Sequence, residues 1–274
     1  MFGLLAWLFT AFAQPQPLRI VINIPAYRLE AFVDDSLVKT VAIAPGMPRY
    51  RTPRGSFEIT RIEWNPWWIP PKSPWAAKEK VTPPGPANPM GKVKLNFDAL
   101  YFVHGSPFES SIGTAASHGC VRVKNAEAIE LARLVHRFGT PELGEQEVDQ
   151  LATDTATRVV TLERPVPIEL RYDLVEIRGG RVTVYRDVYG LATRSMRDEA
   201  YAALAASEVD TTRIDEPRIR ALVRNIPRGG RSAPIDSLMR RRGEENPDAI
   251  GAATRLSSPP ARPTIIGGPQ RRRR

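Results

Sequence analysis

Apolar and polar residues alternate along the first part of the chain, in runs that suit strands. The runs LRIVINIP, YRLEAFV and LVKTVAIA between Leu18 and Ala44 are rich in β-branched residues and broken at Asp34, Asp35 and Ser36. This pattern predicts a meander of short antiparallel strands. The turn at residues 52–55, TPRG, precedes a further strand, and Gly179-Gly180 marks a hairpin. Further strands are expected at 56–62, 93–103, 158–162, 166–170 and 182–185. We therefore expect a mainly β fold, a sandwich or barrel.

Helical periodicity is confined to two segments. Residues 126–138, AEAIELARLVHRF, place apolar side chains on one helical face, with Glu127 near the start and Gly139 at the end. Acidic residues favour a helix N-terminus and glycine a C-terminus, so a helix is predicted here. His136 within it is expected to lie on the surface, outside any site. A second helix is predicted near 196–206.

Proline and tryptophan are concentrated between residues 64 and 91. Four of the five Trp in the chain and eight Pro lie in this segment. Proline cannot pair within a central strand, so the segment is expected to be a stiff loop anchored by aromatic rings. It could line a substrate site or only cover its own domain.

The charge of the chain is unevenly distributed. The sequence has one Cys and a net charge of +9, and residues 191–274 hold 17 Arg, no Lys and 10 acidic residues. Seven of the nine excess charges thus lie in this C-terminal extension, which argues against a specific nucleic-acid groove in the body. We expect the extension to be largely irregular, partly helical and partly disordered, and able to attract anionic polymers.

The N-terminus carries a short apolar run, GLLAWLFTAFA at residues 3–13. It is too short to cross a bilayer and has the length of a signal-peptide core, with small residues at Ala11 and Ala13. Residues 1–13 are therefore expected to be a signal peptide that exports the protein to the periplasm or cell envelope. A single Cys excludes an internal disulfide.

The candidate chemistry lies between Tyr101 and Val123. His104-Gly105 ends one strand, and Ser117-His118-Gly119-Cys120 precedes another short apolar segment. A thiol becomes a nucleophile only when a base removes its proton. His104 arrives from a separate strand and is the preferred base, with the Gly105 carbonyl orienting its other ring nitrogen. The turn at Gly119 could aim backbone N–H groups at one point, as an oxyanion hole requires.

Other interpretations of these residues remain open. A lone Cys is often only packed in a core. His104, His118 and Cys120 could instead supply three ligands to a metal ion, with water as the fourth, which would suit a metal hydrolase. Arg122 could neutralise a substrate carboxylate or pair inside the fold.

At these residues the sequence resembles the L,D-transpeptidase family of bacterial cell-wall metabolism, with its YkuD-type catalytic domain. The resemblance rests on HGS, SIG and SHGCVRV, and extends to TPRG, NPWWIPP and PPGPANPMG upstream and to VPIELRYD and DVYG downstream. It covers residues 18–190, which we take as the catalytic domain, followed by the extension 191–274.

The resemblance implies a cysteine-dependent acyltransferase that acts on peptidoglycan stem peptides. The family's nucleophile falls on Cys120, its general acid/base on His104 and its third member on the Gly105 carbonyl. Oxyanion and substrate contacts would come from Ser117, His118, Gly119 and Arg122. The implied reaction releases D-alanine, forms a thioester and makes a 3-3 crosslink without a cofactor or metal, and carbapenems should acylate the same thiol.

The acceptor stays open at this stage. Water would make the protein an L,D-carboxypeptidase, and a lipoprotein lysine would make it an anchoring enzyme. A different class of function, a non-catalytic wall-binding protein that uses its Arg-rich extension, is also compatible with the composition.

Overall fold

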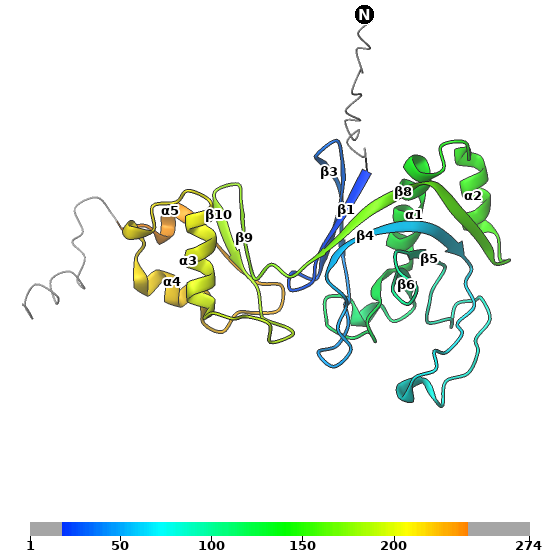
Figure 1. The fold of residues 1–274 in the computed structure, drawn as a ribbon, viewed down its shortest axis with the longest axis horizontal. Helices are drawn as coiled ribbons and strands as arrows, with labels where there is room; N and C mark the ends of the chain where they lie inside the picture. Colours follow the sequence, from blue (N-terminus) through cyan, green and yellow to red (C-terminus); the bar gives the residue numbers. More distant parts are fainter. Residues whose placement is uncertain (1–17, 241–274) are drawn as a thin grey trace, which may run out of the picture.

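The computed structural model describes residues 18–240, which form two lobes joined by a short segment after residue 171 (Figure 1). The larger lobe is built on one eight-stranded sheet with the order β3-β2-β1-β8-β4-β5-β6-β7. Its strands are β1 (Leu18–Asn23), β2 (Arg28–Val33), β3 (Ser36–Ala42), β4 (Gly55–Trp64), β5 (Val93–Asn96), β6 (Phe102–Ser106), β7 (Val121–Lys124) and β8 (Arg158–Arg171). The predicted mainly β, barrel-like fold is confirmed.

The two edges of this sheet approach each other. Beyond β3, Ala44 forms an antiparallel bridge with Arg122 on β7, and Gly46 pairs with Ser117. The sheet is thereby almost closed into a barrel. Closure has a direct consequence for the site, because it brings the segment after β3 against the turn that carries Cys120.

Helix α1 (Asn125–Gly139) follows β7 directly and covers the apolar face of the sheet, with α2 (Glu145–Thr153) beside it. Ala128, Leu131 and Val135 of α1 are fully buried. The predicted helix at 126–138 is confirmed. The expectation that His136 lies on the surface is wrong: it is 1% exposed, and the Trp64 Nε1–H donates to its Nε2 at 3.1 Å. A polar side chain can be buried among apolar neighbours when its hydrogen bonds are satisfied within the core, as those of His136 are.

Two expected strand boundaries differ from the structure. Residues 158–162 and 166–170 belong to one long strand, β8, which shifts register against β4 between Ile59 and Arg61. Pro165 and Pro167 both lie within this strand. The expected strand at 93–103 is instead a pair, β5 and β6, separated by a turn.

The smaller lobe has a sheet and a core of its own. Its strands are β9 (Val175–Arg178), β10 (Arg181–Val184) and β11 (Arg231–Pro234), and its helices are α3 (Met196–Ala206), α4 (Glu216–Val223) and α5 (Ile235–Leu238). Gly179 and Gly180 have positive φ in the predicted hairpin between β9 and β10, and the helix predicted at 196–206 is confirmed. Buried residues in this core include Val182, Val184, Leu204, Ile219 and Leu222.

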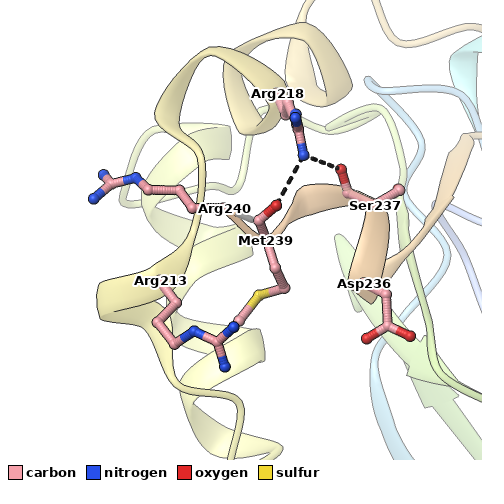
Figure 2. A pocket seen from close by; sticks show the side chains of 6 residues that line it. All are labelled: Arg213, Arg218, Asp236, Ser237, Met239 and Arg240. Carbon is pink, nitrogen blue, oxygen red and sulfur yellow. Dashed lines mark hydrogen bonds between the residues drawn. The ribbon is translucent and has the colours of Figure 1, made fainter. Parts of the chain in front are cut away.

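The expected boundary at residue 190 does not separate the two lobes. Because β10 pairs with β11, the hairpin at 175–184 belongs with the C-terminal extension rather than with the catalytic sheet. The part of the extension that the structure describes is therefore folded. It carries an open cavity of about 610 Å³ lined by Arg213, Arg218, Asp236, Ser237, Met239 and Arg240 (Figure 2).

A group of ion pairs holds the lobes together. Glu30 on β2 accepts two bonds from Arg178, at 2.6 and 2.9 Å, and Arg28 donates to both carboxylate oxygens of Glu176. Glu30 is only 4% exposed. Buried pairs of this kind fix the geometry of an interface, because either charge left alone would be costly.

The expected signal peptide at 1–13 and the end of the extension, 241–274, lie outside the described residues. Within 18–240, none of the helices has the length and apolar character needed to cross a membrane.

Candidate active site

His104 lies in a row of polar residues on one face of the sheet. On β6 it is partnered with Lys94 on β5 and with Arg122 on β7, and partnered residues in a sheet share a face. Cys120 precedes β7 directly, two residues before Arg122. The charges of Lys94 and Arg122 act on both the imidazole and the thiol. His104 and Cys120 thus come from neighbouring segments of the sheet, strand β6 and the turn just before β7.

The His104 ring is buried and oriented by the next residue. It is 2% exposed, and its Nδ1 lies 2.7 Å from the Gly105 carbonyl oxygen. A carbonyl can only accept, so the proton of the neutral ring sits on Nδ1 and Nε2 carries the lone pair. Burial lowers the pKa of His104 to about 4 despite the Gly105 bond, which keeps the ring neutral at physiological pH.

Residues 117–120, which we call the cysteine turn, are held together by hydrogen bonds of the Ser117 hydroxyl. Ser117 Oγ accepts from the Gly119 N–H at 3.0 Å and donates to the Cys120 carbonyl. Gly119 has φ of 117°, and a Cβ there would lie 2.7 Å from the Tyr101 ring. Both its backbone conformation and its surroundings therefore require glycine.

The hydrogen bond between Ser117 and Gly119 changes one expectation. Gly119 and Ser117 were both expected to contact the oxyanion or the substrate, but they bond to each other within the turn. Among the described residues, the N–H groups of His118 and Cys120 have no recorded backbone partner. These two groups are the ones the turn leaves available to a ligand.

Cys120 is in its thiol form in this structure. Burial raises the pKa of the Cys120 thiol to about 11, and the opposing effects of the Phe102 backbone, Arg122 and Lys94 are smaller. Sγ lies 3.6 Å from the Leu100 carbonyl oxygen, a weak S–H contact. The raised pKa of the thiol and the lowered pKa of the His104 ring both favour the neutral forms of these groups.

Thr52 contacts the cysteine turn directly, although no site role was predicted for it. The TPRG segment was interpreted as a turn and as part of the family resemblance. Thr52 Oγ1 donates to the Gly119 carbonyl at 2.9 Å and accepts from the Gly46 N–H at 2.8 Å. One signal in the sequence could have indicated this role. Thr52 is a hydroxyl residue within TPRG, a turn that is also one of the motifs of the family resemblance.

The Trp/Pro-rich loop, residues 64–91, reaches the cysteine turn through aromatic rings. Trp75 stacks on the His118 ring, with centroids 3.8 Å apart and an angle of 12° between planes, and Tyr50 lies at 4.7 Å from the same ring. Trp68 stacks on Trp75 in turn. His118 thus faces the loop, and burial lowers the pKa of its ring.

The base of the loop covers His104. Asn88 is fully buried and donates from Nδ2 to the carbonyls of Pro66, Thr82 and Pro83, while its Oδ1 accepts from Met90 N–H. A Cβ at Gly91 would lie 2.4 Å from the carbonyl carbon of Gly105. The loop is thus ordered by one amide and packed on the backbone that orients His104.

Arg122 is half-buried and has no acidic partner among the described residues. Burial lowers the pKa of its guanidinium. Within residues 18–240, no group of three or more His, Cys, Asp or Glu side chains is placed to hold a metal ion. The alternative in which His104, His118 and Cys120 bind a metal therefore lacks support from the geometry.

A nearly closed sheet that presents a cysteine turn beside a buried, oriented histidine has the organisation of a catalytic domain. Comparison with known families identifies it: residues 17–168 match the YkuD family model, described as an L,D-transpeptidase catalytic domain. The chain belongs to the L,D-transpeptidase family.

Individual relatives agree with this assignment. The YkuD protein of Bacillus licheniformis, named as an L,D-transpeptidase, is 32% identical over 120 residues, which is 43% of this chain and 61% of the relative. The ErfK/SrfK protein of Salmonella typhimurium, named likewise, is 28% identical over 163 residues, 56% of this chain and 47% of the relative. The match thus spans about half to three-fifths of these relatives.

Among solved structures, an L,D-transpeptidase from Mycobacterium smegmatis is similar over 57% of this chain and 58% of its own. The sequence identity is 16% and the TM-score is 0.36.

Proposed function

We propose that this protein is an L,D-transpeptidase that forms 3-3 crosslinks in peptidoglycan through a thioester on Cys120. The observation that carries the proposal is the state of His104. Its Nδ1 bonds to the Gly105 carbonyl at 2.7 Å, so in the neutral ring Nε2 carries the lone pair that a general base needs. A base with a fixed tautomer, one strand away from the single thiol, suits general acid/base catalysis.

The first half-reaction would be acylation. His104 Nε2 takes the thiol proton, and Sγ forms a bond to the carbonyl carbon of the diaminopimelate residue at position three of a stem tetrapeptide. The carbonyl electron pair moves to oxygen and then returns, breaking the C–N bond. The departing D-alanine nitrogen takes the proton from His104, and a thioester remains.

The second half-reaction would transfer the acyl group. A side-chain amine of a second stem loses a proton to His104 and attacks the thioester carbon, and the C–S bond breaks. The thiolate recovers the proton and a new amide joins the stems. The energy of the original amide is kept in the thioester, so no nucleotide or cofactor enters the reaction.

The resting protonation states support this sequence. With pKa values of about 11 for the thiol and about 4 for the ring, the neutral pair dominates at pH 7. An electrophile bound at Sγ would therefore be attacked as the proton leaves. The thiol is protected from unrelated reagents until substrate arrives.

Arg122 is proposed to bind a substrate carboxylate. It is half-buried on the face of His104 and is partnered with it in the sheet, and stem peptides are rich in carboxylates. A guanidinium without an acidic neighbour offers a bidentate site to such a group. Around the site, Leu100 and Phe108 are exposed and could contact apolar parts of the substrate.

We further propose that the protein works in the periplasm or cell envelope, exported by residues 1–13. The Arg-rich extension would then help to retain it at the wall through anionic polymers. Both proposals rest on sequence composition.

The decisive test is intact-mass spectrometry of the full protein with a stem tetrapeptide and, separately, with a carbapenem. The expected result is a covalent adduct on Cys120, absent from Cys120→Ala, with release of D-alanine from the tetrapeptide. Adduct formation that survives Cys120→Ala would overturn the proposal.

The products identify the acceptor. A dimeric stem indicates 3-3 crosslinking, a tripeptide indicates L,D-carboxypeptidase activity, and a peptide on an added lipoprotein lysine indicates anchoring. The non-catalytic alternative is tested by ending the chain after Arg240, which keeps both described lobes. Under our proposal D-alanine release survives this truncation.

A further inference from the structure

The hydroxyl of Thr52 joins two segments that are distant in sequence. Thr52 is 1% exposed, and its Oγ1 accepts from Gly46 N–H at 2.8 Å while donating to the Gly119 carbonyl at 2.9 Å. Since the hydroxyl has one proton, that proton is committed to Gly119. The contact thus fixes the carbonyl side of the peptide between Gly119 and Cys120.

Fixing this carbonyl also fixes the N–H on the other side of the same peptide. The described chain contains no cis peptide bonds, and in a trans peptide the C=O and N–H point in opposite directions. The Cys120 N–H is therefore aimed away from Thr52. It has no recorded hydrogen-bond partner among the described residues, whereas the Gly119 N–H is held by Ser117.

We propose that Thr52 is a positioning residue: through the Gly119 carbonyl it holds the Cys120 N–H as an oxyanion donor. The inference rests on the proposed function, because only acyl transfer places negative charge on a carbonyl oxygen beside Sγ. A donor must already point at that oxygen when the charge develops, since reorienting a peptide during the reaction would raise the barrier.

Tyr189 supports Thr52 from outside the family match. The Tyr189 hydroxyl accepts from the Thr52 N–H at 3.2 Å and donates to the Gly46 carbonyl at 2.9 Å. Tyr189 lies beyond residue 168, where the family match ends, in the loop between β10 and α3 of the smaller lobe. The backbone and side chain of Thr52 are thereby both held.

Tyr189 is itself anchored. Its N–H donates to the hydroxyl of Tyr172 at 2.6 Å, and that hydroxyl donates to Asp187 at 2.6 Å. The two rings stack with centroids 5.4 Å apart. A chain of hydrogen bonds thus runs from the connection between the lobes to the peptide of the nucleophile. Tyr172 and Tyr189 would thereby contribute to catalysis indirectly, by holding Thr52 in place.

The test compares two reactions of the same thiol. Acylation by a carbapenem forms an oxyanion, but alkylation by iodoacetamide displaces iodide at a saturated carbon and forms none. Thr52→Val keeps the shape of the side chain and removes the hydroxyl. We expect the acylation rate to fall about 10- to 100-fold, less than the roughly 100- to 1,000-fold cost of removing an oxyanion donor itself, because Thr52 only positions that donor. The alkylation rate at pH 9 should stay unchanged within about twofold.

Two variants separate positioning from folding. Thr52→Ser restores the hydroxyl and should recover most of the acylation rate. Tyr189→Phe removes only the hydroxyl that supports Thr52 and should lower acylation about threefold or more, again without a change in alkylation. Thr60→Val, at an exposed position of β4, is the matched control and should behave like the wild type.

The outcomes distinguish this inference from the proposed function. If the wild-type protein forms no carbapenem adduct, the proposed function fails. If it does, and Thr52→Val and Tyr189→Phe acylate at the wild-type rate, or lose acylation and alkylation equally, the positioning role is overturned. If Thr52→Val does not fold by its thermal melt, Thr52→Ser and Tyr189→Phe decide the question.

Discussion

The indole of Trp75 stacks on the imidazole of His118, with ring centroids 3.8 Å apart and planes 12° from parallel. One ring belongs to the Trp/Pro-rich loop and the other to the cysteine turn, so the loop is docked on the residues that precede the nucleophile. Stacked aromatic pairs contribute about 0.5–1.5 kcal/mol beyond the area they bury. The docked position of the loop therefore depends measurably on this contact.

Replacing Trp75 should loosen the loop without unfolding the barrel. We expect Trp75→Leu to reduce the rate of carbapenem acylation about two- to tenfold, which corresponds to the stacking energy above. The loop should also become more sensitive to limited proteolysis. Trp67→Leu is a matched control, because Trp67 is in the same loop but 47% exposed. Equal effects of the two variants would refute a specific role for the stack.

The reaction of Cys120 with iodoacetamide should report its raised pKa. With a pKa of about 11, roughly one thiol in a thousand is ionised at pH 8, against about one in ten for an ordinary cysteine of pKa 9.0. Alkylation should thus be about a hundredfold slower than for the urea-unfolded chain and should rise about tenfold per pH unit between pH 8 and 10. A plateau below pH 8 would contradict this.

His104→Ala sharpens that experiment. We expect it to abolish acylation, because the proton acceptor is lost, yet to leave the alkylation profile of the resting thiol nearly unchanged. The reason is that His104 is neutral, with a pKa of about 4, and does not stabilise a thiolate in the resting site. A large change in the alkylation profile would instead reveal an ion pair between the two residues.

Sequence patterns predicted the parts of the fold that depend on local periodicity. The helices at 126–138 and 196–206 and the hairpin at Gly179-Gly180 follow from spacing and turn residues, and the structure confirms them. The strands predicted at 158–162 and 166–170 are one long strand, β8, which contains Pro165 and Pro167 although proline is unfavourable within a strand. Pairing with β4 around a register shift outweighs that local signal.

The site was predicted unevenly for a similar reason. His104, Gly105 and Cys120 were predicted as site residues because their chemistry is distinctive, and the contact between His104 and the Gly105 carbonyl is present. Thr52 and Tyr189 act through hydrogen bonds across 67 and 137 positions of sequence, and periodicity carries no information on such distant contacts. The surface placement of His136 failed because its partner, Trp64, lies 72 positions away.

The ion pairs between the lobes should make a larger contribution to stability than those on the surface. Glu30→Ala leaves Arg178 and the buried part of Arg28 without their carboxylate. Removing one member of a buried pair costs about 3–5 kcal/mol of stability. We expect Glu30→Ala to lower the free energy of unfolding by about half of that, because Arg178 is partly exposed to solvent. Asp35→Ala breaks an exposed pair with Arg19 and should cost less than about 1 kcal/mol.

Urea unfolding followed by circular dichroism measures both variants. A separate early transition in Glu30→Ala would show that the smaller lobe has lost its attachment to β2. If Glu30→Ala and Asp35→Ala have the same free energy of unfolding, the ion pairs between the lobes contribute no more to stability than the surface pair does.

His136 should make the fold sensitive to mild acid. Its Nε2 accepts from the Trp64 N–H at 3.1 Å and its Nδ1 lies 2.9 Å from Thr140 Oγ1, whose own proton goes to the His136 carbonyl. Protonating Nε2 would place two N–H groups against each other. Burial lowers the pKa of His136 to about 4, below the 6.5 of an unfolded chain.

The direction of the effect follows from proton binding. Between pH 6.5 and about 4 the unfolded chain binds a proton at this residue and the folded protein does not, so stability falls as the pH falls through this window. The buried His104 has a lowered pKa as well, so it destabilises the folded protein in the same direction as the pH falls. We expect the free energy of unfolding to drop by about 2 kcal/mol per histidine between pH 6.5 and 5.

His136→Gln isolates one of these protons. The Gln side chain can offer an oxygen to the Trp64 N–H and does not titrate, so the variant should show a pH slope smaller by about one proton between pH 6.5 and 5. Urea unfolding at half-unit pH intervals gives that slope for both proteins. The same slope in His136→Gln as in the wild type would mean that His136 is protonated inside the fold, and that its bond to Trp64 does not hold it neutral.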